Sequence, residues 1–221
     1  MFDQDFHNMQ VKRYRKNFAS DIIFKEVSER IEEVVADMQD AFKKNFSNIL
    51  AHNFYSEMSI VTDDSKPYDL IISNLELHYD NNIQDTLTKY RSMLADGGAI
   101  VCTLFGGKTL IELRQILEQA ELKLRNGVSP RVIPMIDVKD AGRLLQVSGY
   151  SYAIADLDSM EVHYKNFSDM LRHAKKIGQS NAITARNKAY PGAALFGEAS
   201  NIAGDENLQS TFEIVTLSGI K

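Results

Sequence analysis

The stretch YDLIISN, Tyr68 to Asn74, decides the fold of this 221-residue chain. Its centre is almost continuously apolar, which is typical of a strand buried on both faces of a parallel sheet. A helical pattern follows from Ile83 to Leu94, Asp96-Gly97-Gly98 ends that helix, and a second apolar run spans Ala99 to Phe105. Strand, helix and strand form a βαβ crossover, which is right-handed in nearly every known case. The pattern predicts an α/β protein.

Hydrophobic periodicity predicts further elements on both sides of this crossover. Helices are expected over Asp21 to about Phe46, Leu110 to Leu124, Val138 to Ser148 and Phe167 to Ile177. Short strands are expected over Ser59 to Thr62, Tyr152 to Asp156, Met160 to Tyr164 and Thr211 to Leu217. We expect the last of these strands to be an antiparallel edge strand on a mostly parallel sheet. The segment Ala51 to Met58 and the tract 190–207, rich in glycine and alanine, show no clear pattern.

The composition is that of one globular domain, with 44% apolar and 25% charged residues. We expect a helical lead-in over residues 1–45 and an α/β domain over residues 46–221. The net charge of -5 disfavours a general affinity for nucleic acid or for anionic membranes. The one cysteine, Cys102, lies in an apolar run and suits a reducing compartment. With no signal-peptide pattern and no transmembrane stretch, a cytoplasmic location without membrane insertion is expected.

Polar residues follow the two central strands at their carboxyl ends, where ligands bind in open α/β sheets. Asn74 can orient a polar ligand through its amide, and His78 can act as a general base at neutral pH. The alternative is that Asn74 caps a turn and His78 packs at the sheet edge. Asp63 and Asp64 follow a predicted strand, either as ligands of an adenine amine or ribose hydroxyl or as ordinary loop carboxylates.

Several other kinds of site are disfavoured by the motifs present. Five histidines without H-x-x-H spacing, and a single cysteine, argue against a structural zinc site, so no metal is expected. The chain contains neither G-x-S-x-G nor G-x-x-x-x-G-K-[ST]. Serine hydrolases and P-loop proteins are therefore set aside.

The run Tyr68 to Tyr79, followed by Leu94 to Gly98, resembles motifs of class I S-adenosylmethionine-dependent methyltransferases. More specific segments resemble one subgroup, which contains methyltransferase-like assembly factors of respiratory complex I and relatives of the malonyl-carrier-protein methyltransferase of biotin synthesis. These segments are Gly106 to Arg114, Ser129 to Pro134, Asp137 to Gln146 and Thr211 to Ile214. The residues Phe2-Asp3, Arg13 to Phe18 and Asp21 to Arg30 resemble the lead-in helix of that subgroup.

The resemblance implies a Rossmann-like methyltransferase sheet, S-adenosyl-L-methionine as cofactor, and a protein or carrier-protein acceptor. A respiratory complex I subunit is one such acceptor. It implies that Asn74 and His78 lie near the transfer site. The residues implied at the cofactor are Asp63, Asp64, Ser73, Asn74 and Leu75, and those expected at the acceptor are Tyr14, Arg15, Arg114 and Arg131.

The chain departs from this family pattern after its first strand. Family members carry a glycine-rich loop there, which lets the backbone approach the methionine part of the cofactor. The segment Asn48 to Tyr55 stands in that place and contains no glycine. The distance to Tyr68 is also too short for two further βα units. We therefore predict a sheet whose N-terminal part is truncated and a cofactor loop that is deleted.

Three functional hypotheses are compatible with this pattern. The first is a methyltransferase-like enzyme of this subgroup with reduced or lost cofactor binding, for which hydroxylation of an arginine is a further option. The second is a non-catalytic assembly or binding factor related to complex I assembly. The third is an internally deleted gene product, which would expose apolar sheet edges.

Overall fold

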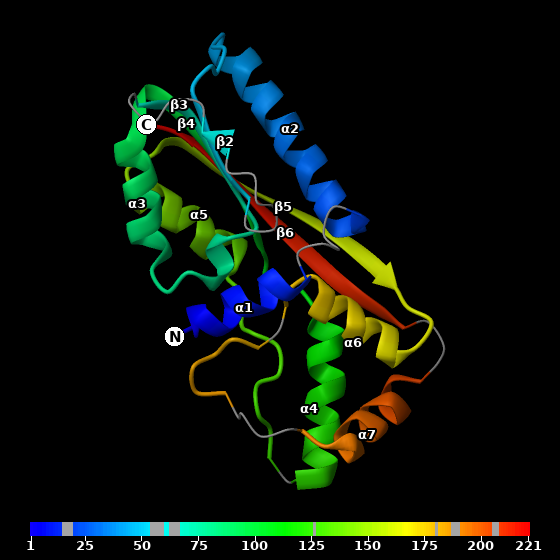
Figure 1. Ribbon diagram of the computed structural model, residues 1–221. Helices are drawn as coiled ribbons and strands as arrows, with labels where there is room; N and C mark the ends of the chain where they lie inside the picture. Colours follow the sequence, from blue (N-terminus) through cyan, green and yellow to red (C-terminus); the bar gives the residue numbers. More distant parts are fainter. Residues whose placement is uncertain are drawn as a thin grey trace. The chain divides into compact units, whose positions relative to one another are not determined.

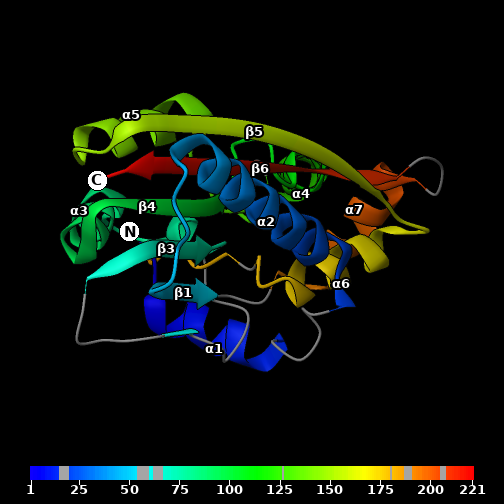
Figure 2. The same cartoon turned by 90° about the horizontal axis from the view of Figure 1, so that it is seen from above.

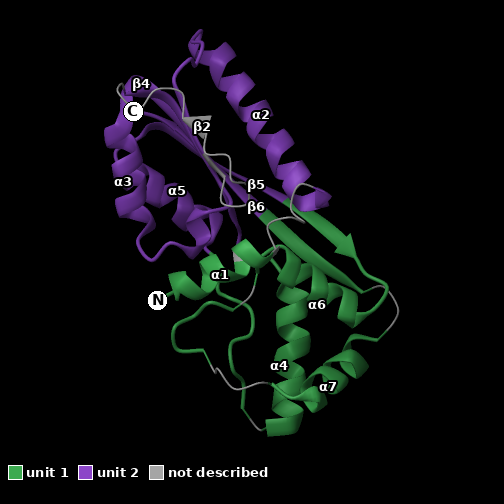
Figure 3. Cartoon of the chain, in the orientation of Figure 1, with its two compact units in different colours: residues 1–17, 108–135, 159–213 green, residues 18–107, 136–158, 214–221 purple. Residues whose placement is uncertain are grey.

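The computed structural model describes residues 1–14, 20–53, 60–61, 67–125, 127–179, 181–186, 191–204 and 208–221. The chain divides into two compact units (Figure 3). Unit 1 comprises residues 1–17, 108–135 and 159–213, and unit 2 comprises residues 18–107, 136–158 and 214–221. The predicted division of the sequence after residue 45 stays a prediction.

The described strands form one mixed sheet of six strands in the order β2-β1-β3-β4-β6-β5 (Figures 1 and 2). The pairs β1/β3 and β3/β4 are parallel, whereas β1/β2 and β4/β6 are antiparallel. The strands are β1 (Ile49–Asn53), β2 (Ile60–Val61), β3 (Tyr68–Asn74), β4 (Leu94–Phe105), β5 (Ser151–His163) and β6 (Gln209–Ile220). The prediction of an α/β, Rossmann-like sheet is confirmed.

The antiparallel last strand is present, but its predicted place in the sheet is wrong. β6 lies between β4 and β5, and β5 is the edge strand. Residues Ala99–Phe105 of β4 pair with Ile220–Ile214 of β6. Since β6 has neighbours on both sides, it buries nearly its whole length, which an edge strand does not do.

β5 is a single strand of 13 residues, whereas the sequence predicted two short strands around Asp158 and Ser159. Asp158 of the predicted turn, like Asp156 before it, is held in the strand by an ion pair with one arginine. Asp156 and Asp158 both bind Arg30 of helix α2, with 3.1 Å between Arg30 Nε and Asp158 Oδ2. Because β5 lies at the edge of the sheet, it tolerates exposed polar side chains without ending.

The predicted helices are confirmed to within a few residues. The described helices are α1 (Gln4–Tyr14), α2 (Ile22–Phe42), the 3-10 turn η2 (Leu77–Tyr79), α3 (Ile83–Met93), α4 (Ile111–Arg125), α5 (Val138–Val147), α6 (Phe167–Lys176) and α7 (Ala193–Ala203). Asp21 and Asp137 cap α2 and α5 by accepting hydrogen bonds from Ile23 N and Lys139 N. Helix α7 was not predicted, because the glycine- and alanine-rich tract has no amphipathic stripe.

The predicted crossover from β3 through α3 to β4 is confirmed and forms the core of unit 2. Leu70, Ile71 and Ile100 are fully buried between covering helices. α2 lies on one face of the sheet, and α3 and α5 lie on the other (Figure 1). Glycine is required where β4 begins, because a Cβ on Gly98 would lie 2.8 Å from the carbonyl oxygen of Ala95.

The N-terminal side of the sheet is short, as predicted. β1 runs parallel to β3, with Asn53 beside Asn74, and residues 54–67 carry the chain from one strand to the other. Within them β2 pairs antiparallel with β1, so it leads the chain back toward the start of β3. A parallel connection normally needs a crossover of a dozen or more residues, usually helical. Beyond β1, the described residues add to this side only the two-residue strand β2.

Candidate functional site

The chain turns sharply where β3 ends. Leu75 adopts the left-handed conformation, with φ at 50°, although it is not glycine and its side chain is fully buried. Its backbone N–H donates to the carbonyl oxygen of Thr103 at 2.9 Å and to the Thr103 hydroxyl at 3.1 Å. A left-handed non-glycine residue costs roughly 1–2 kcal/mol, so these bonds hold a strained turn.

The same hydroxyl orients Asn74. Thr103 Oγ1 accepts from Leu75 N with a lone pair, and it donates its single hydrogen to Asn74 Oδ1 at 3.0 Å. Asn74 is 5% exposed, and its amide oxygen is committed to Thr103. The amide nitrogen is therefore the end that can donate to a ligand. A role of Asn74 in orienting a polar ligand stays a prediction.

Next to Asn74 in the chain, Ser73 belongs to a polar cluster with Glu76, Tyr90 and Cys102, in which Glu76 is half-buried and the other three are buried. Ser73 Oγ donates to Glu76 Oε2 at 3.2 Å. Burial first, and the Glu76 carboxylate second, raise the pKa of both Tyr90 and Cys102 well above their usual ranges. Both groups are therefore protonated at neutral pH. Cys102 packs in the core as a small hydrophobe, as predicted, and is not a nucleophile.

His78 lies on the turn η2 and is 4% exposed. Its ring packs against Tyr79, with 4.7 Å between ring centroids, and edge-on against Phe105 at 5.0 Å. The structure therefore brings His78 to the ends of β3 and β4, beside aromatic rings. This packing matches the predicted alternative of a histidine at the sheet edge, and a role at a transfer site stays a prediction.

The two arginines expected to bind an acceptor hold one loop of unit 1. Arg131 Nε donates to Glu121 Oε1 at 3.0 Å, and Glu121 is 1% exposed. Arg114 Nη2 donates to the carbonyl oxygen of Ile133 at 3.1 Å. Glu121 also accepts from Ser129 N, so both arginines tie the segment 129–133 to α4. Acceptor binding by Arg114 and Arg131 stays a prediction.

Three of the predicted site residues lie outside the described residues: Arg15, Asp63 and Asp64. Tyr14 ends α1, and its side chain also lies outside the description. Thr103 was not predicted. The available signal was a hydroxyl residue at a fully buried position near the carboxyl end of a strand, since a buried hydroxyl nearly always has a partner.

These residues fit an adenosyl cofactor only in part. Ser73 and Leu75 are fully buried, and their polar groups bond within the protein. Of the three residues expected to bind the cofactor at the end of β3, Asn74 is the one whose amide nitrogen can still donate to a ligand. Residues 48–67 contain no glycine, so the close backbone approach of a glycine loop is not available from them.

The described part of the chain has neither a candidate metal site nor a membrane-spanning helix. It contains no group of three or more histidine, cysteine, aspartate or glutamate side chains that could hold a metal ion. None of its helices has the length and apolarity needed to cross a membrane.

The parallel strands β1, β3 and β4 and the antiparallel β6 beside β4 define a Rossmann-like α/β protein, with polar residues at the carboxyl ends of the strands. No family model matches the chain. Its sequence is homologous to proteins named arginine-hydroxylase NDUFAF5, mitochondrial, and malonyl-[acyl-carrier protein] O-methyltransferase.

Three of these relatives show how far the similarity extends. The NDUFAF5 protein of Mus musculus is 30% identical over 175 residues, which cover 76% of this chain and 51% of that protein. The NDUFAF5 protein of Danio rerio is 28% identical over 205 residues, or 89% of this chain and 63% of that protein. The O-methyltransferase of Xylella fastidiosa is 26% identical over 191 residues, or 84% and 62%. The chain thus spans about half to under two thirds of the length of these relatives.

Proposed function

We propose that this chain is a methyltransferase-like protein that acts on a protein or carrier-protein acceptor and binds S-adenosyl-L-methionine weakly. The homology to an O-methyltransferase over 84% of the chain carries this proposal. The parallel strand ends with Asn74 and His78 support it. Because the chain resembles assembly factors of respiratory complex I, the proposal includes a complex I subunit among the acceptors.

We propose that the cofactor binds weakly because the chain lacks the glycine residues that would contact its methionine part. Backbone groups of a glycine loop normally bind the methionine part of the cofactor. Residues 48–67 contain no glycine, whereas the Asn74 donor at the end of β3 is present and oriented by Thr103. Binding would therefore depend more on Asn74 than in a protein with both halves of the site. The protein's part in transfer would be to position donor and acceptor groups.

Isothermal titration of the purified chain with S-adenosylhomocysteine tests this proposal. We expect saturable binding that is weaker than for the Xylella fastidiosa O-methyltransferase measured in parallel. Asn74→Leu should abolish the binding. Asp96→Asn is the control, because Asp96 is fully exposed at the opposite, amino end of β4 and should leave binding unchanged. Both variants are checked by thermal melting.

The outcomes separate the parts of the proposal. Absence of binding at millimolar S-adenosylhomocysteine would refute the proposed cofactor. An equal loss of affinity in Asn74→Leu and Asp96→Asn would refute the role of Asn74 in binding it. If binding is found, mass spectrometry of an incubated acceptor identifies the reaction. The mass of an added methyl group supports methyl transfer, whereas the mass of an added oxygen atom identifies hydroxylation and overturns it.

A further inference from the structure

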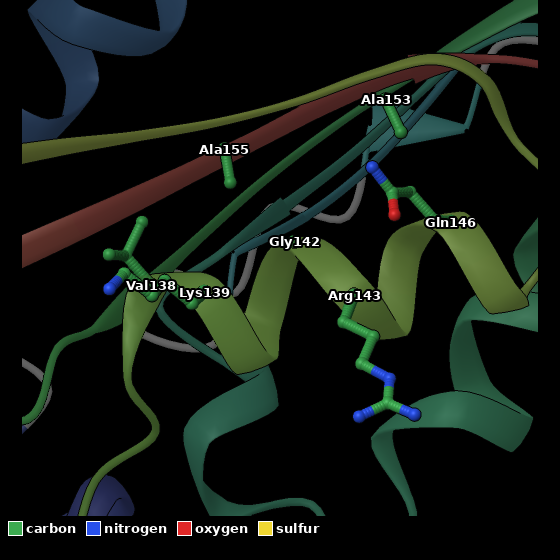
Figure 4. Close-up of a pocket in the computed structure, with 7 residues that line it drawn as sticks. All are labelled: Val138, Lys139, Gly142, Arg143, Gln146, Ala153 and Ala155. Carbon is green, nitrogen blue, oxygen red and sulfur yellow. The ribbon is translucent and has the colours of Figure 1, made fainter.

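A pocket of about 370 Å³ lies in unit 2 between helix α5 and the edge strand β5 (Figure 4). Its lining residues come from those two elements and are Val138, Lys139, Gly142, Arg143, Gln146, Ala153 and Ala155. The side chain of Gln146 points toward Ala153, and Arg143 extends away from the strand (Figure 4). The helix approaches β5 closely at Gly142, where a Cβ would lie 3.0 Å from the Cβ of Ala155. One wall of this pocket is therefore the edge of a sheet.

The charged side chains of the pocket are both cations. Lys139 and Arg143 are exposed, and within the described residues neither forms an ion pair. The lining contains no carboxylate. The pocket is therefore complementary to a negatively charged group, although the chain as a whole carries a net charge of -5.

The other face of β5 offers apolar side chains. Tyr152 and Ile154 are 73% and 59% exposed, and Phe42 of α2, 40% exposed, packs against Tyr152 with 5.6 Å between ring centroids. Ile154 alternates with Ala153 and Ala155, so it lies on the opposite face. Tyr152, whose φ of 49° is left-handed, is placed on that same face by its contact with Phe42. The edge of β5 thus has a cationic pocket on one face and apolar side chains on the other.

The half of β5 that is open to a partner is Ser151–Ala155. Asp156 and Asp158, farther along the strand, are held by Arg30, and charges of this kind protect an edge from pairing. Among the described strands, no neighbour lies beyond β5 on this side. An extended segment can add to such an edge through backbone hydrogen bonds, while pockets for alternate side chains give specificity.

We propose that the edge Ser151–Ala155 binds an extended segment of a partner protein in which acidic and apolar residues alternate. The acidic side chains would meet Lys139 and Arg143 on the α5 face. The apolar side chains would meet Tyr152 and Ile154 on the α2 face. This interaction surface goes beyond the proposed function and does not depend on cofactor binding.

A second copy of the chain fits this surface less well. If two β5 strands paired antiparallel about a two-fold axis, each copy would place Ala153, Ala155 and Leu157 on the α5 face of its partner. None of these side chains carries a charge for Lys139 and Arg143. Asp156 and Asp158 lie on the other face, where they are already bound to Arg30.

Fluorescence anisotropy with a labelled peptide that alternates glutamate and valine tests the charge part of the proposal. We expect saturable binding that falls about tenfold in the double variant Lys139→Glu/Arg143→Glu, because attraction becomes repulsion at two positions. A lysine–valine peptide should show the reverse preference and bind the double variant better. Lys89→Glu, on the exposed face of α3, is the control and should bind the glutamate peptide as the unaltered protein does.

Hydrogen exchange tests the edge part. Bound glutamate–valine peptide should slow exchange of amides within Ser151–Ala155. Equal affinity for the two peptides, or protection confined to other segments, would overturn the proposal. A concentration-dependent dimer that protects the same amides without peptide, detected by sedimentation, would also overturn it and assign the edge to a second copy.

Discussion

Thr103 and Asn74 are joined across neighbouring parallel strands by a hydrogen bond of 3.0 Å, in which the Thr103 hydroxyl is the donor. Their backbones are in register, since Asn74 of β3 pairs with Thr103 of β4. The same hydroxyl accepts from Leu75 N. One buried side chain thus sets both the orientation of Asn74 and the left-handed turn after it.

Replacing Thr103 by valine should destabilise the protein, because Asn74 Oδ1 would be left buried without its donor. The expected loss in free energy of unfolding is about 1–3 kcal/mol, measured by denaturant unfolding. Thr103→Ser should recover most of it, since serine keeps the hydroxyl. Thr88→Val on the exposed face of α3 is the control and should change the stability by less than about 0.5 kcal/mol. A serine variant as unstable as the valine variant would contradict the role of the hydroxyl.

Glu121 should be essential to the stability of unit 1. It is 1% exposed and binds Arg131 at 3.0 Å and the backbone of Ser129 at 2.5 Å. Glu121→Gln removes the charge and leaves Arg131, itself 14% exposed, without its counter-ion. Breaking a buried ion pair costs about 3–5 kcal/mol, and we expect the lower end because glutamine retains one acceptor. Glu118→Gln on the same helix is the matched control, and an equal effect there would refute the prediction.

His7 should make the protein less stable in mild acid. Burial lowers the pKa of His7 from 6.5 to about 4, so the folded protein keeps this ring neutral while the unfolded chain protonates it. Above pH 6.5 the ring is neutral in both states. As the pH falls from 6.5 toward about 4, the free energy of unfolding decreases by up to about 3 kcal/mol. Unfolding measured across this range should show a shallower pH dependence for His7→Gln. The exposed His163→Gln should leave the dependence as it was, and the same flattening there would assign the effect elsewhere.

Gly142 should resist replacement although it lies inside a helix. Gly to Ala normally favours a helix by up to about 1 kcal/mol. Here the new Cβ would lie 3.0 Å from the Cβ of Ala155 and push α5 away from β5. We expect Gly142→Ala to lower the melting temperature and the additional change Ala155→Gly to restore it. If Ala155→Gly made no difference in the presence of Gly142→Ala, the close approach would not be the cause.

The crossover from β3 through α3 to β4 could be predicted from sequence because each part is buried in a regular way. Leu70, Ile71 and Ile100 are fully buried, so their run of apolar residues reports burial on both faces of the strand. The Asn74 side chain could be placed at the sheet's carboxyl edge for the same reason. Caps such as Asp21 and Asp137 marked helix starts through bonds to residues two positions away.

The position of β6, the continuity of β5 and the existence of α7 could not be predicted in this way. They depend on partners distant in the chain: β4 for β6, Arg30 for Asp156 and Asp158, and α4 for α7. A local pattern shows that a strand is buried, but not which strands lie beside it. It likewise shows Asp158-Ser159 as a turn, because the cation that binds Asp158 is Arg30, far away in the chain.

The local sequence was therefore sufficient for the α/β class, the central crossover and the candidate position of Asn74, because burial and capping leave marks within a few residues. Tertiary structure decided which atoms of that site are available. It committed the Asn74 oxygen to Thr103, 29 positions along the chain, and Arg131 to Glu121. The physical reason is that a hydrogen bond or ion pair depends on distances of about 3 Å. These distances are set by the packing of elements that lie far apart in the sequence.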